Sequence, residues 1–410
     1  MMEEMVKARW LAVAGLMVVS ACTEDLLAPE NGACPDYCPP EHVAVVDSVL
    51  FDNIVSDSLY QGYVRSWEAG SVQAYRDSTA TGDAGSRVFY RFPAFSDSLL
   101  LSSSDTVLGA VVGTDSFVVA VPVVGRNINQ RGLELEFHRL PATIDSMASF
   151  VDLDSYFADS TIVATVSVAD SVTGDSVYAT LDSAAFPSFA ADGNRAALGV
   201  ALRTARGYVH FGAVPGGSAP LLTRYLRLDS AGTAVSRVQG KNAVTSAVAV
   251  TPAPAVGADE RAAGGLPSVR TLLRFDMPAR IVDSSTVLRA TLVLVPTDKV
   301  LGPPGDTLAL LAQGLAADFG PKSPLEYLVN DSIVARLGFF PVGSSDTLRL
   351  DVTTLVRAWV ADSTVPRALV VRAIPEGGSI AEVRFGSVTS GLDRPRLQVT
   401  FAPPVTLGGR

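Results

Sequence analysis

The chain has 410 residues, a hydrophobic fraction of 48% and a net charge of -10. At about 100–200 residues per domain, this length accommodates two or three domains with sizeable cores. The negative charge argues against a nucleic-acid partner, which requires a basic surface. Three cysteines and three histidines are too few for a multi-ligand Cys/His metal site.

The N-terminal segment is typical of an export signal. Residues 10–20 form an uncharged apolar run that follows Lys7 and Arg9. This run is shorter than the about 20 residues needed to span a bilayer, and it fits the apolar region of a signal peptide. Met1 and Met5 both stay open as the true start.

The apolar run ends in Val19-Ser20-Ala21-Cys22, which resembles the lipobox of bacterial lipoproteins. The resemblance implies a signal peptide over 1–21, acylation of Cys22 and a membrane anchor, which is stable when several acyl chains are attached. Because Thr23 rather than Asp follows, the resemblance implies the outer membrane of a Gram-negative bacterium, facing the periplasm or outward. The alternative is an ordinary secretory signal with a chance cysteine.

A tether is expected over residues 22–42, where Pro, Gly and acidic residues occur without periodicity. It contains Cys34 and Cys38, which we expect to form a local disulfide in an oxidising compartment. Two thiols alone make a poor zinc site, so we predict no metal here.

Three short sequences recur in the same order, which indicates an internal repeat. The last two matches lie 90 residues apart in both copies. The matched segments are 87–92 with 270–275, VVAVP ending at Pro122 with LVLVP ending at Pro296, and 209–212 with 383–386. We therefore predict two copies, at 43–235 and 236–403, and a short tail at 404–410. Each copy is expected to fold separately; one larger sandwich shared by both halves is the alternative.

Each copy is predicted to consist of β-strands. In the first copy Val88, Tyr90 and Phe92 alternate with Arg87, Phe89 and Arg91, which is the period of a half-buried strand. VVAVP and LVLVP are continuous apolar runs, typical of strands buried on both sides. Asp-Ser pairs recur between the strands and favour turns. Many short strands with frequent turns predict an all-β sandwich.

One short helix is predicted over residues 351–359, with Asp351 at its start. Val352, Leu355 and Trp359 fall on one helical face, so Trp359 is expected in the core. The first copy has residues 181–186 at the corresponding place, where we expect Pro187 to shorten the helix.

The order RTLLRFDMPARI, TLVLVP, DTLRLDVTTLVRAWV, RALVVRA and RPRLQVTF resembles the DNRLRE-type domain. The resemblance covers residues 236–401, and the first copy shares it through the internal repeat. The literal DNRLRE string is absent. The family is a carbohydrate-binding-module-like β-sandwich of surface proteins. Membership implies a jelly-roll β-sandwich and polysaccharide binding, and it does not imply catalysis. Together with the internal repeat, it predicts two tandem jelly-roll-like antiparallel β-sandwich domains.

The sequence offers little for catalysis, and we predict that the protein is not an enzyme. The histidines are His42, His138 and His210; His210 lies in a strand and corresponds to Arg384 in the second copy, which favours a surface position. Half of the aspartates lie in Asp-Ser pairs, which favour turns rather than paired catalytic carboxylates. No cofactor is predicted, although a structural calcium ion stays open because Asp152-Leu-Asp154 and Asp192-Gly-Asn194 offer oxygen ligands.

Sugar stacking requires exposed aromatic rings, and Trp67 is the candidate outside the predicted core. Arg87, Phe89 and Arg91 form a second candidate platform, although arginine stems that cover apolar surface are the alternative. We therefore expect a non-catalytic cell-envelope lipoprotein that binds polysaccharide. The alternative is a structural or adhesive lipoprotein that contacts another envelope protein and has no glycan ligand.

Overall fold

The computed structural model describes residues 45–65, 68–79, 83–101, 108–171, 174–183, 186–214, 218–230, 233–283, 285–318, 320, 326–327 and 337–403. Antiparallel strands dominate them, and the predicted all-β sandwich-like fold is confirmed. The predicted signal peptide and tether (1–21 and 22–42), the three cysteines, Trp67 and the tail at 404–410 lie outside the described residues.

The first sandwich, which we call the host sandwich, is built from residues 46–61 and 260–402. Its four-stranded sheet has the order β1-β24-β17-β21, from β1 (Val46–Leu50), β24 (Arg396–Ala402), β17 (Thr286–Leu294) and β21 (Leu348–Asp351). Its other sheet has the order β19-β18-β22-β16-β15-β23, with β2 on β16 and β20 on β18. These strands are β2 (Ile54–Gln61), β15 (Glu260–Gly264), β16 (Val269–Phe275), β18 (Thr307–Ala317), β19 (Glu326–Tyr327), β20 (Gly338–Pro341), β22 (Ala368–Ala373) and β23 (Glu382–Gly386).

The core of the host sandwich lies between its two sheets and is closed by a helix. Alternate residues from both sheets enter one apolar cluster, to which β1 contributes Leu50 and β2 contributes Ile54. The helix α4 (Thr353–Ala361) buries Trp359 completely, which confirms its predicted core position. Asp351 stays just outside α4, and its Oδ1 accepts a hydrogen bond of 3.0 Å from the backbone N–H of Thr353. Short elements α3 (Ala279–Val282) and η6 (Gly391–Asp393) complete this sandwich.

The second sandwich, which we call the inserted sandwich, spans residues 71–250. Its strands follow the order β13-β12-β6-β11-β3-β4-β10-β7-β8, with β14 on β4 and with β5 and β9 on β6. They are β3 (Ser71–Asp77), β4 (Ala84–Phe92), β5 (Ser98–Leu100), β6 (Leu108–Arg126), β7 (Leu133–Leu140), β8 (Ile162–Val168), β9 (Ser176–Thr180), β10 (Ala196–Leu202), β11 (Arg206–Gly212), β12 (Leu221–Ser230), β13 (Thr233–Asn242) and β14 (Thr245–Val250).

The two predicted faces of β4 are confirmed, but the strand is not half-buried: each face packs against a different apolar cluster. Val88, Tyr90 and Phe92 enter the main core of the inserted sandwich. On the opposite face, residues 141–161, which include η2 (Asp154–Tyr156) and η3 (Asp159–Thr161), form a covering segment over the sheet. This segment contributes Leu153 to a second apolar cluster.

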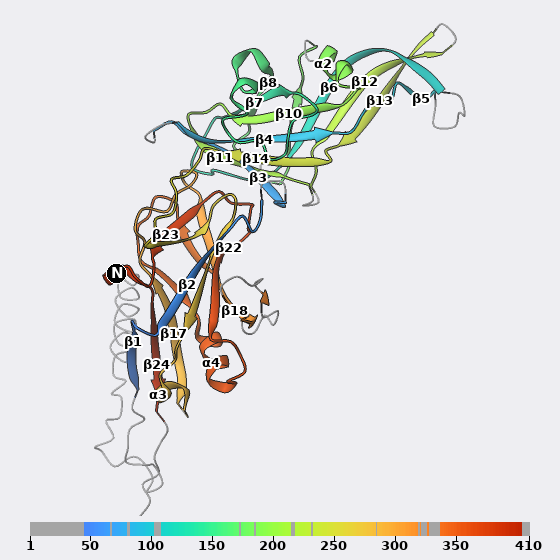
Figure 1. Cartoon of the computed structure of the whole chain (residues 1–410). Helices are drawn as coiled ribbons and strands as arrows, with labels where there is room; N and C mark the ends of the chain where they lie inside the picture. Colours follow the sequence, from blue (N-terminus) through green and yellow to red (C-terminus); the bar gives the residue numbers. More distant parts are fainter. Residues whose placement is uncertain are drawn as a thin grey trace, which may run out of the picture. The chain divides into compact units, whose positions relative to one another are not determined.

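The strand pairing corrects the predicted boundaries at 43–235 and 236–403. Strands β1 and β2 pair with β24 and β16, so they belong with the later segment. Strands β13 and β14 pair with β12 and β4, so they belong with the earlier one. One sandwich is therefore inserted between β2 and β15 of the other; in Figure 1, blue β1 lies beside red β24. The repeat located the shared core strands, but it carried no information on the partners of the flanking strands.

The helix in the first copy also differs from the prediction. Pro187 was expected to shorten a helix over residues 181–186, yet α2 (Phe186–Ala191) contains Pro187 in its first turn. Proline is favoured there because the first N–H groups of a helix have no intrahelical acceptor and the ring fixes a helical φ. Proline therefore marks the beginning of this helix.

Candidate functional site

The predicted platform on β4 is covered in the structure. Arg87, Phe89 and Arg91 share the outer face of the strand as expected, but Phe89 is only 1% exposed. It packs beneath the covering segment, against Ile144 and Leu153. Phe89 therefore fills a core and is not available to stack on a sugar.

The two arginines of this face bind the covering segment to the sheet. Nη1 of Arg87 donates to the carbonyl of Phe150 at 2.5 Å and lies 2.6 Å from Oδ1 of Asp154. Nη1 of Arg91 donates to the carbonyl of Ile144 at 3.3 Å. Both guanidinium groups thus satisfy backbone carbonyls of an irregular segment instead of reaching solvent.

The two described histidines lie in strands of the inserted sandwich. His138, on β7, is 1% exposed, and its burial lowers its pKa to about 4, so the ring is neutral at pH 7. The ring of His210, on β11, packs edge-on against Tyr208 at 5.3 Å, and its Nε2 lies 2.7 Å from Nε2 of Gln73. His42 lies outside the described residues.

The outer face of the four-stranded sheet of the host sandwich carries three arginines. Alternation along the strands turns Arg289, Arg349 and Arg396 away from the core. Arg349 and Arg396 both pair in register with Val293 of β17, from opposite sides of that strand. Arg289 lies on β17 itself, four residues before Val293. We call this surface the arginine face.

The arginine face is hollowed. Two hollows of about 420 and 270 Å³ adjoin each other, since they share Arg349 and Gln398, and we call them together the depression. Its other lining residues are Asp47, Val49, Phe51, Arg289, Thr291, Val293, Arg396 and Thr400. The depression therefore combines guanidinium, amide and hydroxyl groups on a rigid sheet.

The charges of the arginine face are not balanced locally. Within the described ranges, no carboxylate forms an ion pair with Arg289, Arg349 or Arg396. The carboxylate that lines the depression is that of Asp47, which accepts a hydrogen bond of 2.5 Å from Oγ1 of Thr400. At the other end the guanidinium of Arg396 lies 5.6 Å from the ring centroid of Phe51, which is 40% exposed. An anionic group would find unpaired donors here.

Sequence reasoning missed the arginine face. Its arginines lie in three separate segments, LRATLVL, DTLRLD and RPRLQVTF. Each strand shows only one arginine at an outward position among residues that enter the core. That signal becomes a site only when the three strands are known to be neighbours.

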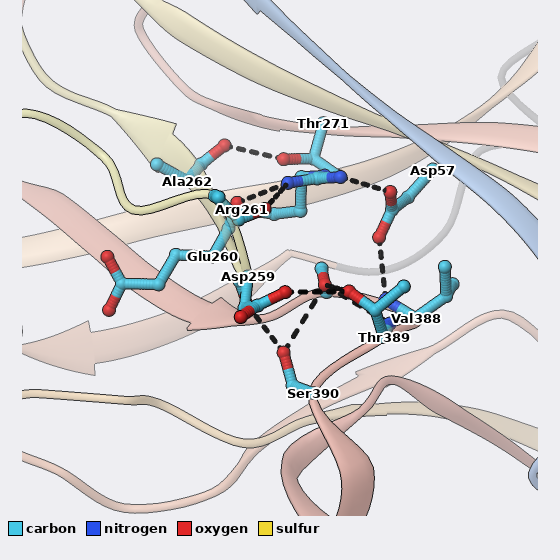
Figure 2. Close-up of polar contacts among 11 residues, drawn as sticks. Asp57, Asp259, Glu260, Arg261, Ala262, Thr271, Val388, Thr389 and Ser390 are labelled. Carbon is cyan, nitrogen blue, oxygen red and sulfur yellow. Dashed lines mark hydrogen bonds and ion pairs between the residues drawn. The ribbon is translucent and has the colours of Figure 1, made fainter.

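A second polar cluster, drawn in Figure 2, serves the architecture of the host sandwich. Asp57 of β2 has a side chain only 2% exposed, and its Oδ1 lies 2.6 Å from Nη2 of Arg261. Its Oδ2 accepts a hydrogen bond of 2.7 Å from the backbone N–H of Val388. Asp259 accepts a further hydrogen bond of 3.0 Å from Oγ1 of Thr389. These contacts occupy the carboxylates and attach β2 to the turn after β23.

The carboxylates considered for calcium have other partners. Asp154 pairs with Arg87, while Asp152 accepts a hydrogen bond from Oγ of Ser149 at 2.7 Å. Oδ2 of Asp192 accepts from the backbone N–H of Ala142 at 3.0 Å. In the described part of the chain, no group of three or more His, Cys, Asp or Glu side chains is arranged to hold a metal ion.

The helices of the described residues are all too short or too polar to cross a membrane.

No family model matches the chain, and no curated protein matches it. The solved structure of the Macrobrachium rosenbergii nodavirus is 12% identical, and the match covers 85% of this chain and 94% of that chain with a TM-score of 0.13. A TM-score this low supports no statement about fold or function.

Proposed function

We propose that the protein is a non-catalytic, lipid-anchored module of the cell envelope that binds acidic polysaccharide on the arginine face. The observation that carries this proposal is a hollowed sheet face with three guanidinium groups, none of which has a carboxylate partner among the residues that the structure describes. In a chain of net charge -10, such a local excess of positive charge favours an anionic ligand. The resemblance to DNRLRE-type domains also supports a carbohydrate.

The chemistry of the face fits a carboxylated sugar polymer. Guanidinium groups bind carboxylates through two parallel hydrogen bonds, which gives both strength and direction. Gln398 and Thr400 offer hydrogen bonds for sugar hydroxyls, and the exposed ring of Phe51 offers an apolar surface for a sugar ring. Its lining includes both Asp47 and Val49 of β1, so the depression follows this strand, as an extended chain requires.

Neutralising the arginine face is expected to abolish binding of an acidic polysaccharide. We would measure retardation of the purified protein in gels that contain polygalacturonate or neutral dextran. Each single change, Arg289→Gln, Arg349→Gln or Arg396→Gln, should weaken polygalacturonate binding about tenfold, because each removes charge-assisted hydrogen bonds. The triple variant should bind no more strongly than the background.

The matched control carries Arg131→Gln, Arg195→Gln and Arg227→Gln, which change the net charge equally at exposed positions of the inserted sandwich. It should bind polygalacturonate like the unchanged protein. Equal retardation of the two triple variants would refute the assignment to the arginine face. Absence of retardation by either polysaccharide would refute the polysaccharide function.

The proposed anchor is the acylated Cys22, in the outer membrane of a Gram-negative bacterium. Cys22→Ala should abolish incorporation of a labelled fatty acid and leave the unprocessed precursor, because the thiol is the site of acylation. Immunoblots and lipid labelling in a Gram-negative host measure both effects. Cys34→Ala is the control and should be labelled normally. Normal labelling of the Cys22→Ala protein would remove the anchor from the proposal.

A second candidate function, adhesion to another envelope protein, is favoured by one observation. On the inserted sandwich, Tyr178, Leu221, Tyr225 and Val238 are exposed on one face of β9, β6, β12 and β13. Exposed apolar surface of this kind is typical of protein contacts. This candidate predicts that neither polysaccharide retards the protein.

A further inference from the structure

We propose that the inserted sandwich carries a second carbohydrate site, a pocket that binds one neutral sugar unit. The pocket has a volume of about 310 Å³ and lies on the outer face of the sheet, beside the covering segment. Strands β3, β4, β7 and β10 contribute Arg76, Arg87, His138 and Ala201 to its lining, and the covering segment contributes Phe150 and Phe157. It is separate in sequence and chemistry from the arginine face.

The charged groups around the pocket are already paired, which favours a neutral ligand. Nη2 of Arg76 lies 2.7 Å from Oδ2 of Asp83, and Nη1 of Arg87 lies 2.6 Å from Oδ1 of Asp154. Glu136, whose pKa is raised by burial, has its Oε1 3.5 Å from Nε of Arg203. A bound ion would have to compete with these pairs, whereas a hydroxyl can join them as an extra donor or acceptor.

One buried polar atom of a pocket residue has no hydrogen-bond partner among the described residues. Nε2 of His138 is buried and makes no hydrogen bond with any residue that the structure describes. Nδ1 of the same ring lies 3.1 Å from Oγ1 of Thr161, which fixes the ring orientation. Leaving a buried polar atom unpaired is costly, so a ligand hydroxyl that bonds to Nε2 would gain affinity. Oε2 of Glu136, which also lines the pocket, lies 3.5 Å from Nε2.

The aromatic residues supply apolar walls of fixed orientation. Phe157 packs against the ring of His138 at 4.7 Å and over Gly199, where a Cβ atom would come within 2.5 Å of the Phe157 ring. The guanidinium of Arg87 lies 3.9 Å from the centroid of the Phe150 ring. Rigid rings that contact the C–H faces of a sugar cost little ordering entropy on binding. A volume near the lower end for ligand pockets selects a single sugar unit over an extended polymer.

The test uses the full-length protein and saturation-transfer NMR with D-glucose, D-galactose, D-mannose, N-acetyl-D-glucosamine and L-rhamnose as probes, beside D-glucuronate and inorganic phosphate. At least one neutral sugar should bind and shift the ring resonances of His138. Ala201→Leu fills the pocket, and His138→Phe removes Nε2 while it keeps an aromatic ring. Each change should weaken that binding about tenfold or more. Ala234→Leu, at an exposed position of β13, is the control and should have no effect.

Several outcomes would overturn the inference. These are no binding of any neutral sugar, binding of glucuronate or phosphate alone, or neutral-sugar binding that both pocket variants leave unchanged. Thermal unfolding of each variant shows whether it is folded. If one variant does not fold, the shifts of the His138 resonances in the unchanged protein still locate the ligand. Sugar binding that is lost only in the Arg289/Arg349/Arg396 triple variant would refute the pocket and leave the proposed function intact.

Discussion

Replacing Trp359 with alanine is expected to lower the free energy of unfolding of the host sandwich by about 3–5 kcal/mol. Trp359 is completely buried on α4, where its ring centroid lies 5.1 Å from that of Phe275. Its neighbours in the core come from both sheets, so they cannot collapse into the space without separating paired strands. The large cavity removes apolar burial and dispersion contacts together. Urea unfolding, followed by far-UV circular dichroism, measures the loss.

Two further variants make this prediction specific. Nε1 of Trp359 is buried without a hydrogen-bond partner in the described part of the chain. Trp359→Phe should therefore cost less than Trp359→Ala, because it keeps one ring and removes an unsatisfied N–H group. Leu392 is 92% exposed, and Leu392→Ala should change the unfolding free energy by less than about 0.5 kcal/mol. An unfolding midpoint that Trp359→Ala leaves unchanged would contradict the packing described above.

A fragment of residues 236–410 is expected to fail to fold by itself. It lacks β1 and β2, which pair with β24 and β16 and supply Leu50 and Ile54 to the core. It also lacks Asp57, which leaves Arg261 without its ion pair. The fragment begins with most of β13 and all of β14, whose partner strands β12 and β4 are missing from it. We therefore expect aggregation and no cooperative unfolding transition.

A rearranged chain should restore folding. Residues 45–61, joined to residues 257–403 by a flexible Gly/Ser linker of about ten residues, contain every strand of the host sandwich. Circular dichroism and urea unfolding should show a β-rich protein with a single cooperative transition. Residues 68–252, expressed alone, provide the matching test for the inserted sandwich. Cooperative unfolding of the fragment 236–410 by itself would show that β1 and β2 are dispensable and that the domain boundary predicted between residues 235 and 236 is right.

Local patterns located several elements of this fold. Alternation of residue types located β4, because side chains on a strand point to opposite faces with a period of two, and the internal repeat then located β16. The apolar stripe with Trp359 located α4, because its period is that of a helix. The beginning of α2 at Phe186 was missed because proline is compatible with the first turn of a helix.

The faces of the strands were predicted, but what covers them was not. Arg87, Phe89 and Arg91 do share one face, yet the covering segment packs over Phe89. Its contacts are hydrogen bonds from arginine side chains to irregular backbone, such as Arg91 to the carbonyl of Ile144. Such contacts have no period in the sequence, so neither the covered platform nor the pocket beside it could be predicted.

The sequence by itself determined the fold class, the core strands of both sandwiches and the burial of Trp359, since each depends on the order of apolar residues over a few turns or strands. Only the tertiary structure decided the nesting of one sandwich within the other, because strand pairing over long sequence separations is set by the partner's edge and face. It also decided the arginine face. Arg349 and Arg396 flank Val293 only because β21 and β24 pair with opposite edges of β17.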